Sequence, residues 1–306
     1  MDDVAVVLTF DDRILVGAGV TIQSLLDAAA PTTCYEINII HPGFTEGLKE
    51  TFQSMISASR HTMRFFEISS SRFDGVPKGK GSWTEIVYYR LLASEVLADR
   101  DRVIYSDVDV FVADDLAEVY NTDLDGLEWA GVAAEKNSPE IVMHRYFPEN
   151  KKDKIVFSGF MVMNLALMRS NNVVARYFDL VREIGGRLKF FDLDLVNVAT
   201  PNIGIVPFRY VVLEDIFEAE DVTASREYRY LKSVYSPEEL EEARDNPAII
   251  HYAGKRGKPW QRQHTLPYYR DVEKNLPKGL KSLNFRSFRK KWLSRKGYRR
   301  HKNRRR

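Results

Sequence analysis

Two carboxylates lie two positions apart in the apolar stretch 103–112, VIYSDVDVFV. If this stretch forms one strand, Asp107 and Asp109 point to the same face, with Cα atoms about 7 Å apart. Carboxylates at the end of a buried strand repel each other and lose hydration, so they need a cation, and their oxygens suit magnesium or manganese. The alternative is a pair that only caps a strand and meets solvent, because Asp-x-Asp alone is a weak signal. The apolar flanks favour the metal site.

A histidine lies in the segment 249–260, IIHYAGKRGKPW, between a short apolar strand and a glycine-rich basic turn. An imidazole nitrogen from His251 would complete a mixed oxygen and nitrogen shell for manganese. Glycines such as Gly254 let backbone N–H groups approach an anion closely, and Lys258 adds a point charge that suits phosphate. A metal and this turn together would contact a diphosphate from both sides. The alternative is a structural or solvated histidine, which is the commoner case.

The elements that must position these residues alternate between strand and helix. Apolar runs predict strands at residues 4–10, 35–40, 63–68 and 103–112. Helical spacing, with a capping box at 82–85, predicts helices at residues 17–30, 45–57 and 82–97. The alternation predicts an α/β fold with a mostly parallel, mixed sheet covered by helices on both faces. Ligands of such sheets bind beyond the carboxyl ends of the strands, near which Asp107 and Asp109 fall.

The second half of the chain has weaker patterns. They predict strands at 157–165 and 249–250 and helices at 173–184 and 193–199. Residues 214–246 are charged and mixed, with little sheet pattern. The single cysteine, Cys34, excludes an intrachain disulfide framework and a multi-cysteine zinc site.

The charge of the chain is divided between an acidic body and a basic end. Of the 45 Lys and Arg residues, 14 lie in residues 278–306 with no acidic residue, so the first 277 residues are acidic although the whole chain carries +2. Phe285, Phe288 and Trp292 interleave with these basic residues, which is typical of an interfacial helix attracted to anionic lipid. The alternatives are a solvated, frayed terminus and a nucleic-acid-binding tail. The acidic start is unlike a signal peptide, so we expect a cytoplasmic protein, peripheral on the inner face of the membrane.

The order of these motifs resembles the family-eight glycosyltransferases, which include bacterial lipooligosaccharide and lipopolysaccharide galactosyl- and glucosyltransferases and glycogenin. The motifs are DD at 11–12, YYRL at 88–91, YSDVDV at 105–110, SG at 158–159, NL at 164–165, DLDLVN at 192–197, HYAG at 251–254 and KPW at 258–260. The resemblance covers residues 4–262. It implies a GT-A fold, which is a Rossmann-like fold that binds nucleotide-sugars.

The resemblance also implies a reaction. The expected donor is UDP-galactose or UDP-glucose, the expected cofactor is manganese or magnesium, and the hexose is transferred with retention of configuration. The expected acceptor is a saccharide or glycolipid of bacterial surface polysaccharide synthesis, such as lipopolysaccharide core. With the composition, this divides the chain into a catalytic domain at 1–263, in which 214–246 is a candidate acceptor-side segment, and a basic amphipathic membrane-attachment tail at 264–306.

Individual residues take roles by the same resemblance. The metal ligands would be Asp107, Asp109 and His251. The catalytic residues, which face the donor sugar, would be Arg90, Asp192 and Asp194. The remaining donor-binding residues would be Thr9, Asp11 and Arg13 near the uracil, Ser158 and Gly159 near the sugar, and Gly254 and Lys258 at the diphosphate. The alternatives are a helix cap for Asp11, a surface ion pair for Arg90, and acids that complement a helix dipole for Asp192 and Asp194.

Three positions depart from the family pattern. Leu193 stands where many relatives have a glutamine near the reacting carbon, Phe157 where an asparagine often precedes Ser-Gly, and Ile14 where some relatives stack an aromatic ring on uracil. Asp192 is then the best candidate for a nucleophile or for stabilising an oxocarbenium-like centre, and a same-face attack is equally compatible. The competing functions are a haloacid-dehalogenase-type phosphatase, which also uses Asp-x-Asp after a strand, and a non-catalytic protein that binds membrane or nucleic acid through its tail.

Overall fold

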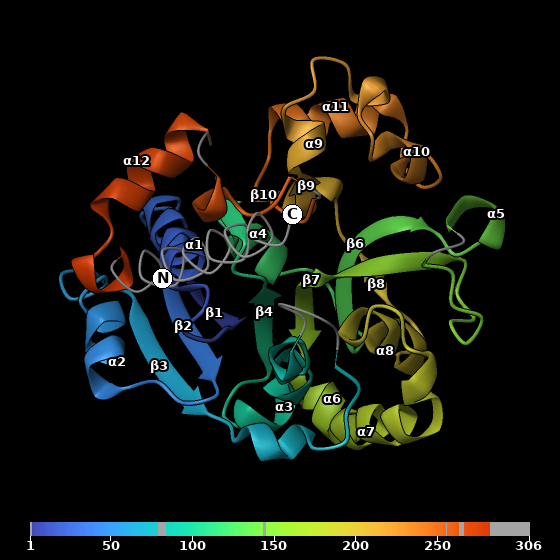
Figure 1. Cartoon of the computed structure of the whole chain (residues 1–306), viewed down its shortest axis with the longest axis horizontal. Helices are drawn as coiled ribbons and strands as arrows, with labels where there is room; N and C mark the ends of the chain where they lie inside the picture. The colour runs from blue at the N-terminus through green and yellow to red at the C-terminus, as the bar shows by residue number, and fades with distance from the viewer. Residues whose placement is uncertain (1, 79–83, 143–144, 255, 263–265, 282–306) are drawn as a thin grey trace, which may run out of the picture.

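The computed structural model describes residues 2–78, 84–142, 145–254, 256–262 and 266–281. Within these ranges the chain forms two sheets (Figure 1). The larger has the order β3-β2-β1-β4-β7-β6-β8 and contains β1 (Asp2–Thr9), β2 (Thr33–His41), β3 (Thr62–Glu67), β4 (Arg102–Ser106), β6 (Trp129–Lys136), β7 (Lys154–Asn164) and β8 (Gly204–Ile205). The smaller has the order β5-β10-β9 and contains β5 (Val110–Val112), β9 (Val212–Leu213) and β10 (Ile249–His251).

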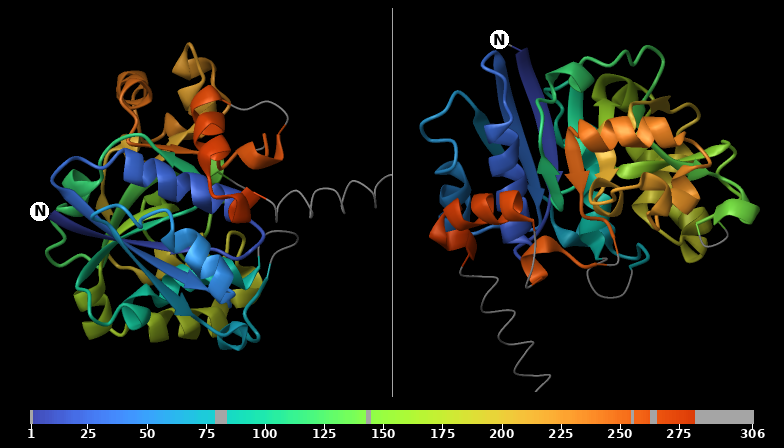
Figure 2. Two further views of the ribbon diagram at one scale, coloured as in Figure 1. Left: turned by 90° about the vertical axis from the view of Figure 1, so that its left-hand side faces the viewer. Right: turned by 90° about the horizontal axis from the view of Figure 1, so that it is seen from above.

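Helices surround the larger sheet (Figure 2). The α-helices are α1 (Leu15–Asp27), α2 (Glu46–Gln53), α3 (Ala93–Val96), α4 (Ala117–Tyr120), α5 (Pro139–Val142), α6 (Leu165–Ser170), α7 (Val173–Ile184), α8 (Asp192–Ala199), α9 (Glu214–Phe217), α10 (Tyr228–Leu231), α11 (Pro237–Asp245) and α12 (Pro267–Asn275). The 3-10 helices are η1 (Ser70–Phe73), η2 (Glu85–Leu92), η3 (Gly185–Arg187), η4 (Phe208–Val211), η5 (Val222–Ala224) and η6 (Pro259–Gln261).

The larger sheet is mixed. β1 pairs in parallel with β2 and β4, and β2 pairs in parallel with β3. β7 runs antiparallel to both β4 and β6. The run from Val4 to Leu8 is buried without a break, as is typical of a strand covered on both faces. The prediction of a mostly parallel α/β sheet with helices on both faces is confirmed.

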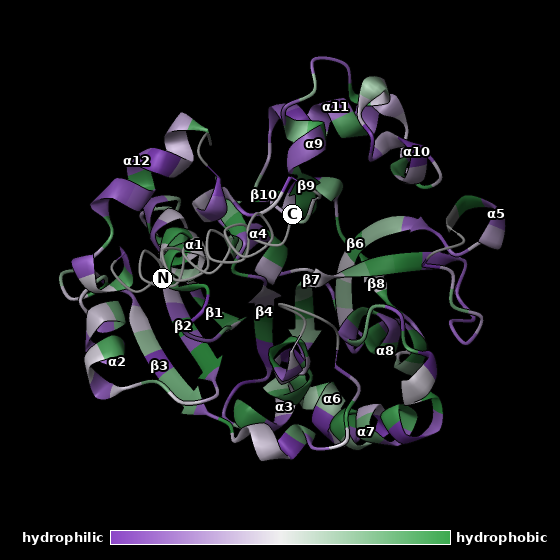
Figure 3. Cartoon of the chain, viewed as in Figure 1, coloured by the Kyte–Doolittle hydropathy of each residue, from purple (hydrophilic) through white to green (hydrophobic). Residues whose placement is uncertain are grey.

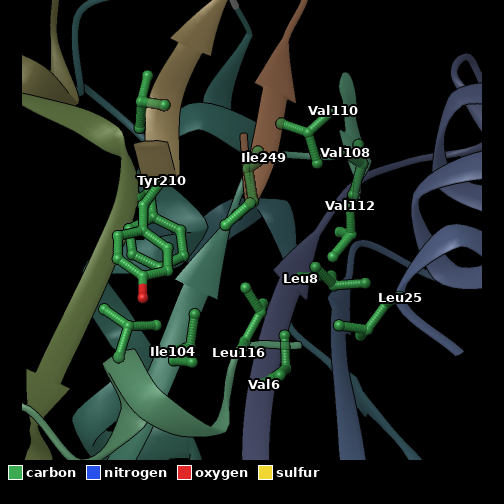
Figure 4. Packing of buried hydrophobic residues seen from close by; sticks show 14 of the residues in the cluster. Val6, Leu8, Leu25, Ile104, Val108, Val110, Val112, Leu116, Tyr210 and Ile249 are labelled. Carbon is green, nitrogen blue, oxygen red and sulfur yellow. The ribbon is translucent and has the colours of Figure 1, made fainter. Parts of the chain in front are cut away.

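The side chains of β1 alternate between two hydrophobic cores. Val6 and Leu8 lie in the core that also contains residues of α1 and α2 (Figure 4). Ala5 and Val7 lie in the core on the other face, which contains residues of η2, α6, α7 and α8. Figure 3 shows apolar residues along the strands of the sheet, where they are covered from both sides. The parallel pairing of β1 with β4, in which Leu8 is the partner of Ser106, places the carboxyl ends of these two strands next to each other.

The stretch 103–112 is not the single strand that its apolar pattern predicts. β4 ends at Ser106 in the larger sheet, and β5 begins at Val110 in the smaller one. The break lies at Asp107 and Asp109. At this break Asp107 Oδ1 lies 2.9 Å from Arg90 Nη2, and Asp109 contacts Lys258, so both carboxylates have cationic partners.

The predicted α-helix at 82–97 is mainly the 3-10 helix η2, followed by the short α3. Five consecutive residues from Tyr88 to Leu92 are buried. These five residues have no solvent-facing side, so the amphipathic spacing of a surface helix does not apply to them, although Glu95 in α3 is exposed. Ser82 of the predicted capping box lies outside the described residues, and the side chain of Thr84 makes no capping hydrogen bond.

The segment 214–246 is helical, and part of the predicted tail packs on the body. α9, η5, α10 and α11 follow one another through 214–246. Tyr269 and Leu276 pack with residues of α1, and Leu280 is fully buried. The expected tail from residue 264 therefore begins with an ordered helix, α12, while the aromatic stripe from Phe285 lies outside the described residues. Among the helices described, none is both long and apolar enough to span a membrane.

Candidate active site

The candidate active site lies where the two sheets meet. The turn 107–109, here called the acidic turn, connects β4 of the larger sheet to β5 of the smaller one. β5 pairs antiparallel with β10, and Val110 is the partner of His251. Strand pairing thus places His251 beside the acidic turn, although the two are far apart in the sequence.

Asp107, Asp109 and His251 form a cluster that suits a divalent cation. One potential ligand atom from each residue lies within 4.8 Å of the others. His251 Nε2 is 3.3 Å from Asp109 Oδ1 and 3.6 Å from Asp107 Oδ2. Both ring nitrogens of His251 are buried and neither makes a hydrogen bond, although these carboxylates are close enough for an ion pair. A buried imidazole beside two carboxylates is a donor set that fits manganese or magnesium, so the residues present fit the expected metal.

Lys258 completes the charge balance of the acidic turn. Its Nζ contacts Asp109 Oδ2 and donates to the Tyr252 carbonyl at 2.9 Å. Burial raises the pKa of Asp109, but Lys258 and His251 outweigh burial and hold that pKa well below its usual value. Asp109 is therefore a carboxylate at any physiological pH. An ammonium group here is placed to contact a phosphate bound beside the cluster.

Arg90 connects the acidic turn to helix α8. The side chain is buried. Its Nη1 lies 3.2 Å from Asp192 Oδ2, and its Nη2 lies 2.9 Å from Asp107 Oδ1. Its Nη1 also donates to the Ser158 carbonyl at 2.7 Å, and its guanidinium lies 4.4 Å from the ring centroid of Tyr105. Arg90 is thus a buried bridge between two carboxylates, and the alternative of a surface ion pair is wrong.

The two aspartates of α8 point to different partners. Burial raises the pKa of Asp192 to about 6, and Arg90 opposes that rise. Asp194 Oδ2 instead accepts from the backbone N–H groups of Lys189 and Phe190, at 2.6 and 2.7 Å. Phe191, the residue directly before α8, has a φ of +47°, a strained value for an aromatic residue. Asp194 thus closes the turn before α8, and Asp192 is the acid that joins the network of Arg90.

Gly159 has no side chain, and this leaves room for the cluster. It lies on β7, and its carbonyl accepts from Asp107 N at 2.9 Å. A Cβ added at Gly159 would lie 2.8 Å from both Asp107 Oδ2 and His251 Cε1. Only glycine fits there, so the predicted Ser158-Gly159 pair lies directly against the metal cluster.

Of the three residues expected near the uracil, the structure links one to the cluster through hydrogen bonds. Thr9 Oγ1 is 3.3 Å from the Tyr105 hydroxyl, which donates to Asp107 Oδ1 at 2.7 Å. Asp11 Oδ2 accepts from Arg13 Nε at 2.7 Å. Thr9 is thereby joined to the cluster, while Asp11 and Arg13 form a separate and more exposed pair. Gly254 is exposed, and a Cβ built on it would meet no atom of the described residues within 4 Å.

Sequence reasoning did not assign roles to several residues that shape the site. Tyr105 contacts Thr9, Asp107 and Arg90, and its position directly before the Ser-Asp-x-Asp motif was the available signal. Trp260 packs so closely on α1 that a Cβ on Gly17 would lie 2.5 Å from its ring. Neither residue has a chemical signature by itself, because each acts by packing and orientation.

The comparisons with known proteins agree with this geometry. A family model described as "Glycosyl transferase family 8" matches residues 5–264. The chain belongs to glycosyl transferase family 8. Glycosyltransferase GlyF of Streptococcus pneumoniae serotype 4 is 26% identical over 261 residues, which are 84% of this chain and 57% of GlyF. General stress protein A of Bacillus subtilis is 21% identical over 215 residues, which are 67% of this chain and 69% of that protein.

Solved structures show the same fold. The galactosyltransferase LgtC, in complex with donor and acceptor sugar analogs, superposes with a TM-score of 0.72 at 21% identity, over 91% of this chain and 99% of that chain. The bifunctional glycosyltransferase WbbM superposes with a TM-score of 0.70 at 21% identity, over 90% of this chain and 50% of that chain. The fold is that of the GT-A glycosyltransferases. This chain therefore spans little more than half of GlyF and half of the WbbM chain.

Proposed function

We propose that this protein is a metal-dependent, retaining glycosyltransferase that moves a hexose, galactose or glucose, from a UDP-sugar to a saccharide or glycolipid acceptor of bacterial surface polysaccharide synthesis. The observation that carries the proposal is the cluster of Asp107, Asp109 and His251, with Lys258 in contact with Asp109. Membership of family 8 supports a nucleotide-sugar donor and a saccharide acceptor, and it argues against a haloacid-dehalogenase-type phosphatase.

The cluster and its neighbours fit the departure of a nucleoside diphosphate. Asp107, Asp109 and His251 would hold a manganese or magnesium ion, which supplies Lewis-acid stabilisation of negative charge when bound. Lys258 adds a positive charge beside the same place, and a cation fixed in advance stabilises the developing charge without reorganisation. Arg90 holds Asp192 close to this point of departure.

Asp192, which is buried and paired with Arg90, is our candidate for the carboxylate that acts on the donor sugar. With a pKa raised by burial to about 6, it is mostly ionised at neutral pH. It would serve as a nucleophile or stabilise an oxocarbenium-like centre, which a buried carboxylate does well. A same-face attack, in which a phosphate oxygen accepts the proton of the acceptor hydroxyl, uses the same residues. Leu193 offers no amide for a double displacement.

Manganese-dependent binding and hydrolysis of UDP-sugars test the proposal. Calorimetric titration of UDP, with and without manganese, measures binding, and a screen of UDP-galactose, UDP-glucose and other UDP-sugars for hydrolysis identifies the donor. We expect UDP to bind in the presence of manganese and one hexose donor to be hydrolysed fastest. The absence of any manganese-dependent response to UDP would exclude the transferase and favour a non-catalytic role.

We also propose that the basic end of the chain attaches the protein to the cytoplasmic face of an anionic membrane. The proposal rests on the 14 basic residues without an acidic one in 278–306. Because Leu280 is buried in the body, the deletion that tests this should remove only residues 282–306. The full chain should sediment with phosphatidylserine-containing vesicles and the deletion variant should not, with unchanged UDP binding. Equal sedimentation of both would disprove the attachment, and retention of the full chain on RNA instead would favour a nucleic-acid partner.

A further inference from the structure

Helix α9 contacts two arginines that lie on either side of Lys258. Arg262 Nη1 and Nη2 donate to Glu214 Oε1 and Oε2 at 2.6 and 2.7 Å, a two-pronged ion pair. Arg256 lies 2.7 Å by its Nε from Asp215 Oδ1 and also contacts Glu218. The first pair is shielded from water, with the Glu214 side chain 3% exposed, whereas Arg256 is 44% exposed. Shielded, two-pronged pairs are the stronger and more geometrically specific kind, so the pair of Glu214 and Arg262 matters most.

Arg262 also fixes the backbone just before Lys258. Its Nε donates to the Gly257 carbonyl at 3.1 Å. Gly257 has a φ of +82°, a conformation that glycine adopts without strain and that sets the direction in which the chain continues. The next residue is Lys258, whose Nζ contacts Asp109. One guanidinium therefore joins Glu214 to the turn from which Lys258 reaches the acidic turn.

Glu214 is itself held in a fixed position relative to the metal cluster. It follows β9 directly, and β9 pairs in parallel with β10, with Leu213 as the partner of His251. The strand that carries a predicted metal ligand and the strand that carries Glu214 are thus hydrogen-bonded neighbours. A displacement of Arg262 relative to Glu214 would be a displacement of Lys258 relative to His251.

We propose that Glu214 is a positioning residue for the donor diphosphate: through Arg262 it fixes the turn at Gly257 and so holds Lys258 where a phosphate beside Asp109 would meet it. This inference rests on the proposed function, because a diphosphate is the ligand expected at Lys258. Among the described residues, no hydrogen bond or ion pair joins Glu214 to Asp107, Asp109 or His251, and its partner is Arg262. Residues that orient the groups in contact with a metal or its ligand change affinity by about 10- to 100-fold when replaced.

The matched control is another buried glutamate in an arginine pair. Glu128 is buried, and its Oε2 lies 2.5 Å from Arg176 Nη2. It is the residue directly before β6. Glu214→Gln and Glu128→Gln thus remove the same charge from similar surroundings. Arg262→Lys serves as a second variant at the site, because it keeps the charge and loses the two-pronged geometry.

Hydrogen exchange in the absence of any ligand tests the structural half of the proposal. Among residues 252–262, the hydrogen-bonded amides of Tyr252, Gln261 and Arg262 should exchange about tenfold faster in Glu214→Gln and Arg262→Lys than in the wild-type protein, because the turn opens more often. Glu128→Gln should leave the exchange of this segment unchanged. Unchanged protection of 252–262 in both site variants would overturn the proposal.

Titration of UDP with manganese tests the functional half. The dissociation constant should rise about 10- to 100-fold in Glu214→Gln and not in Glu128→Gln, and in donor hydrolysis the KM should rise more than kcat falls. Affinities equal to those of the control variant would overturn the inference alone. Failure of the wild-type protein to bind UDP would overturn the proposed function, and the inference with it.

Discussion

Replacing Gly159 by alanine should damage the metal cluster without unfolding the protein. The added Cβ would lie 2.8 Å from Asp107 Oδ2 and from His251 Cε1, where 3.4 Å is the lower limit of ordinary contact. The two side chains must together yield by roughly half an ångström, which exceeds the roughly 0.2 Å tolerance of metal–ligand distances. Both clashing atoms belong to side-chain ends, so the strain is relieved by moving the ligands and not by moving the sheet.

The expected effect is a selective loss of metal affinity. Displaced ligands should weaken manganese binding by about 10- to 100-fold, which corresponds to about 1.4–2.8 kcal/mol. Calorimetric titration of manganese into the UDP-saturated protein measures this loss. The melting temperature of the metal-free variant should change little, because the backbone of β7 keeps its pairing.

Gly204→Ala is the steric control. Its Cβ would lie 2.8 Å from the Cβ of Ala130 on the neighbouring strand, so the clash is as close but lies far from the cluster. Overpacking of this kind costs about 1–3 kcal/mol of stability, and we expect manganese affinity to stay at the wild-type value. If Gly159→Ala binds manganese as tightly as the wild-type protein, or if both variants lose affinity equally, the reasoning about the cluster is refuted.

Three further changes have defined outcomes. Asp109→Ala should abolish manganese-dependent hydrolysis of UDP-sugars, and near-full activity in that variant would disprove the metal site. Burial raises the pKa of Glu135 from 4.5 to about 7, against the opposing charge of Arg145. Between these values the folded chain keeps a proton that the unfolded chain has lost, so stability should fall by about 3 kcal/mol as pH rises through that window. Denaturant titrations at pH 5 and pH 8 measure the free energy of unfolding, which should fall between these pH values in the wild-type protein and not in Glu135→Gln. An equal fall in both proteins would contradict the prediction. Gly17→Ala should push Trp260 off α1 and lower the melting temperature, and an unchanged melting temperature would show that the indole moves freely.

The sequence predicted β1 to β4 and brought attention to the acidic turn because both leave strong local patterns. Continuous apolar runs identify the parallel strands, and carboxylates after such runs identify their ends. Hydrophobic periodicity did not predict the elements correctly where buried residues were continuous but small or aromatic. β6, with Ala130, Gly131, Ala133 and Ala134, has too little apolar bulk to stand out, and η2 is buried without the spacing of a surface helix.

Relations between distant segments could not be predicted from the sequence alone. The stretch 103–112 has one apolar pattern but belongs to two sheets, because β5 pairs with β10, a strand from the other end of the chain. The same holds for Glu214 and Arg262, which have no motif in common and meet only in the folded chain. Asp192 and Asp194 look equivalent in sequence, yet the backbone N–H groups before α8 bind only Asp194.

The contact between Lys258 and Asp109 spans 149 residues of chain, which has a consequence for biosynthesis. At about 5–20 residues per second, a ribosome adds Lys258 roughly 7–30 s after Asp109. During that interval β5 has no partner strand and the two aspartates have neither His251 nor Lys258. The proposed donor and metal would therefore stabilise only a chain translated through Lys258, and they would then favour the folded state by mass action. A ribosome that stalls earlier releases a protein in which β5 has no partner strand and Asp109 lacks both His251 and Lys258.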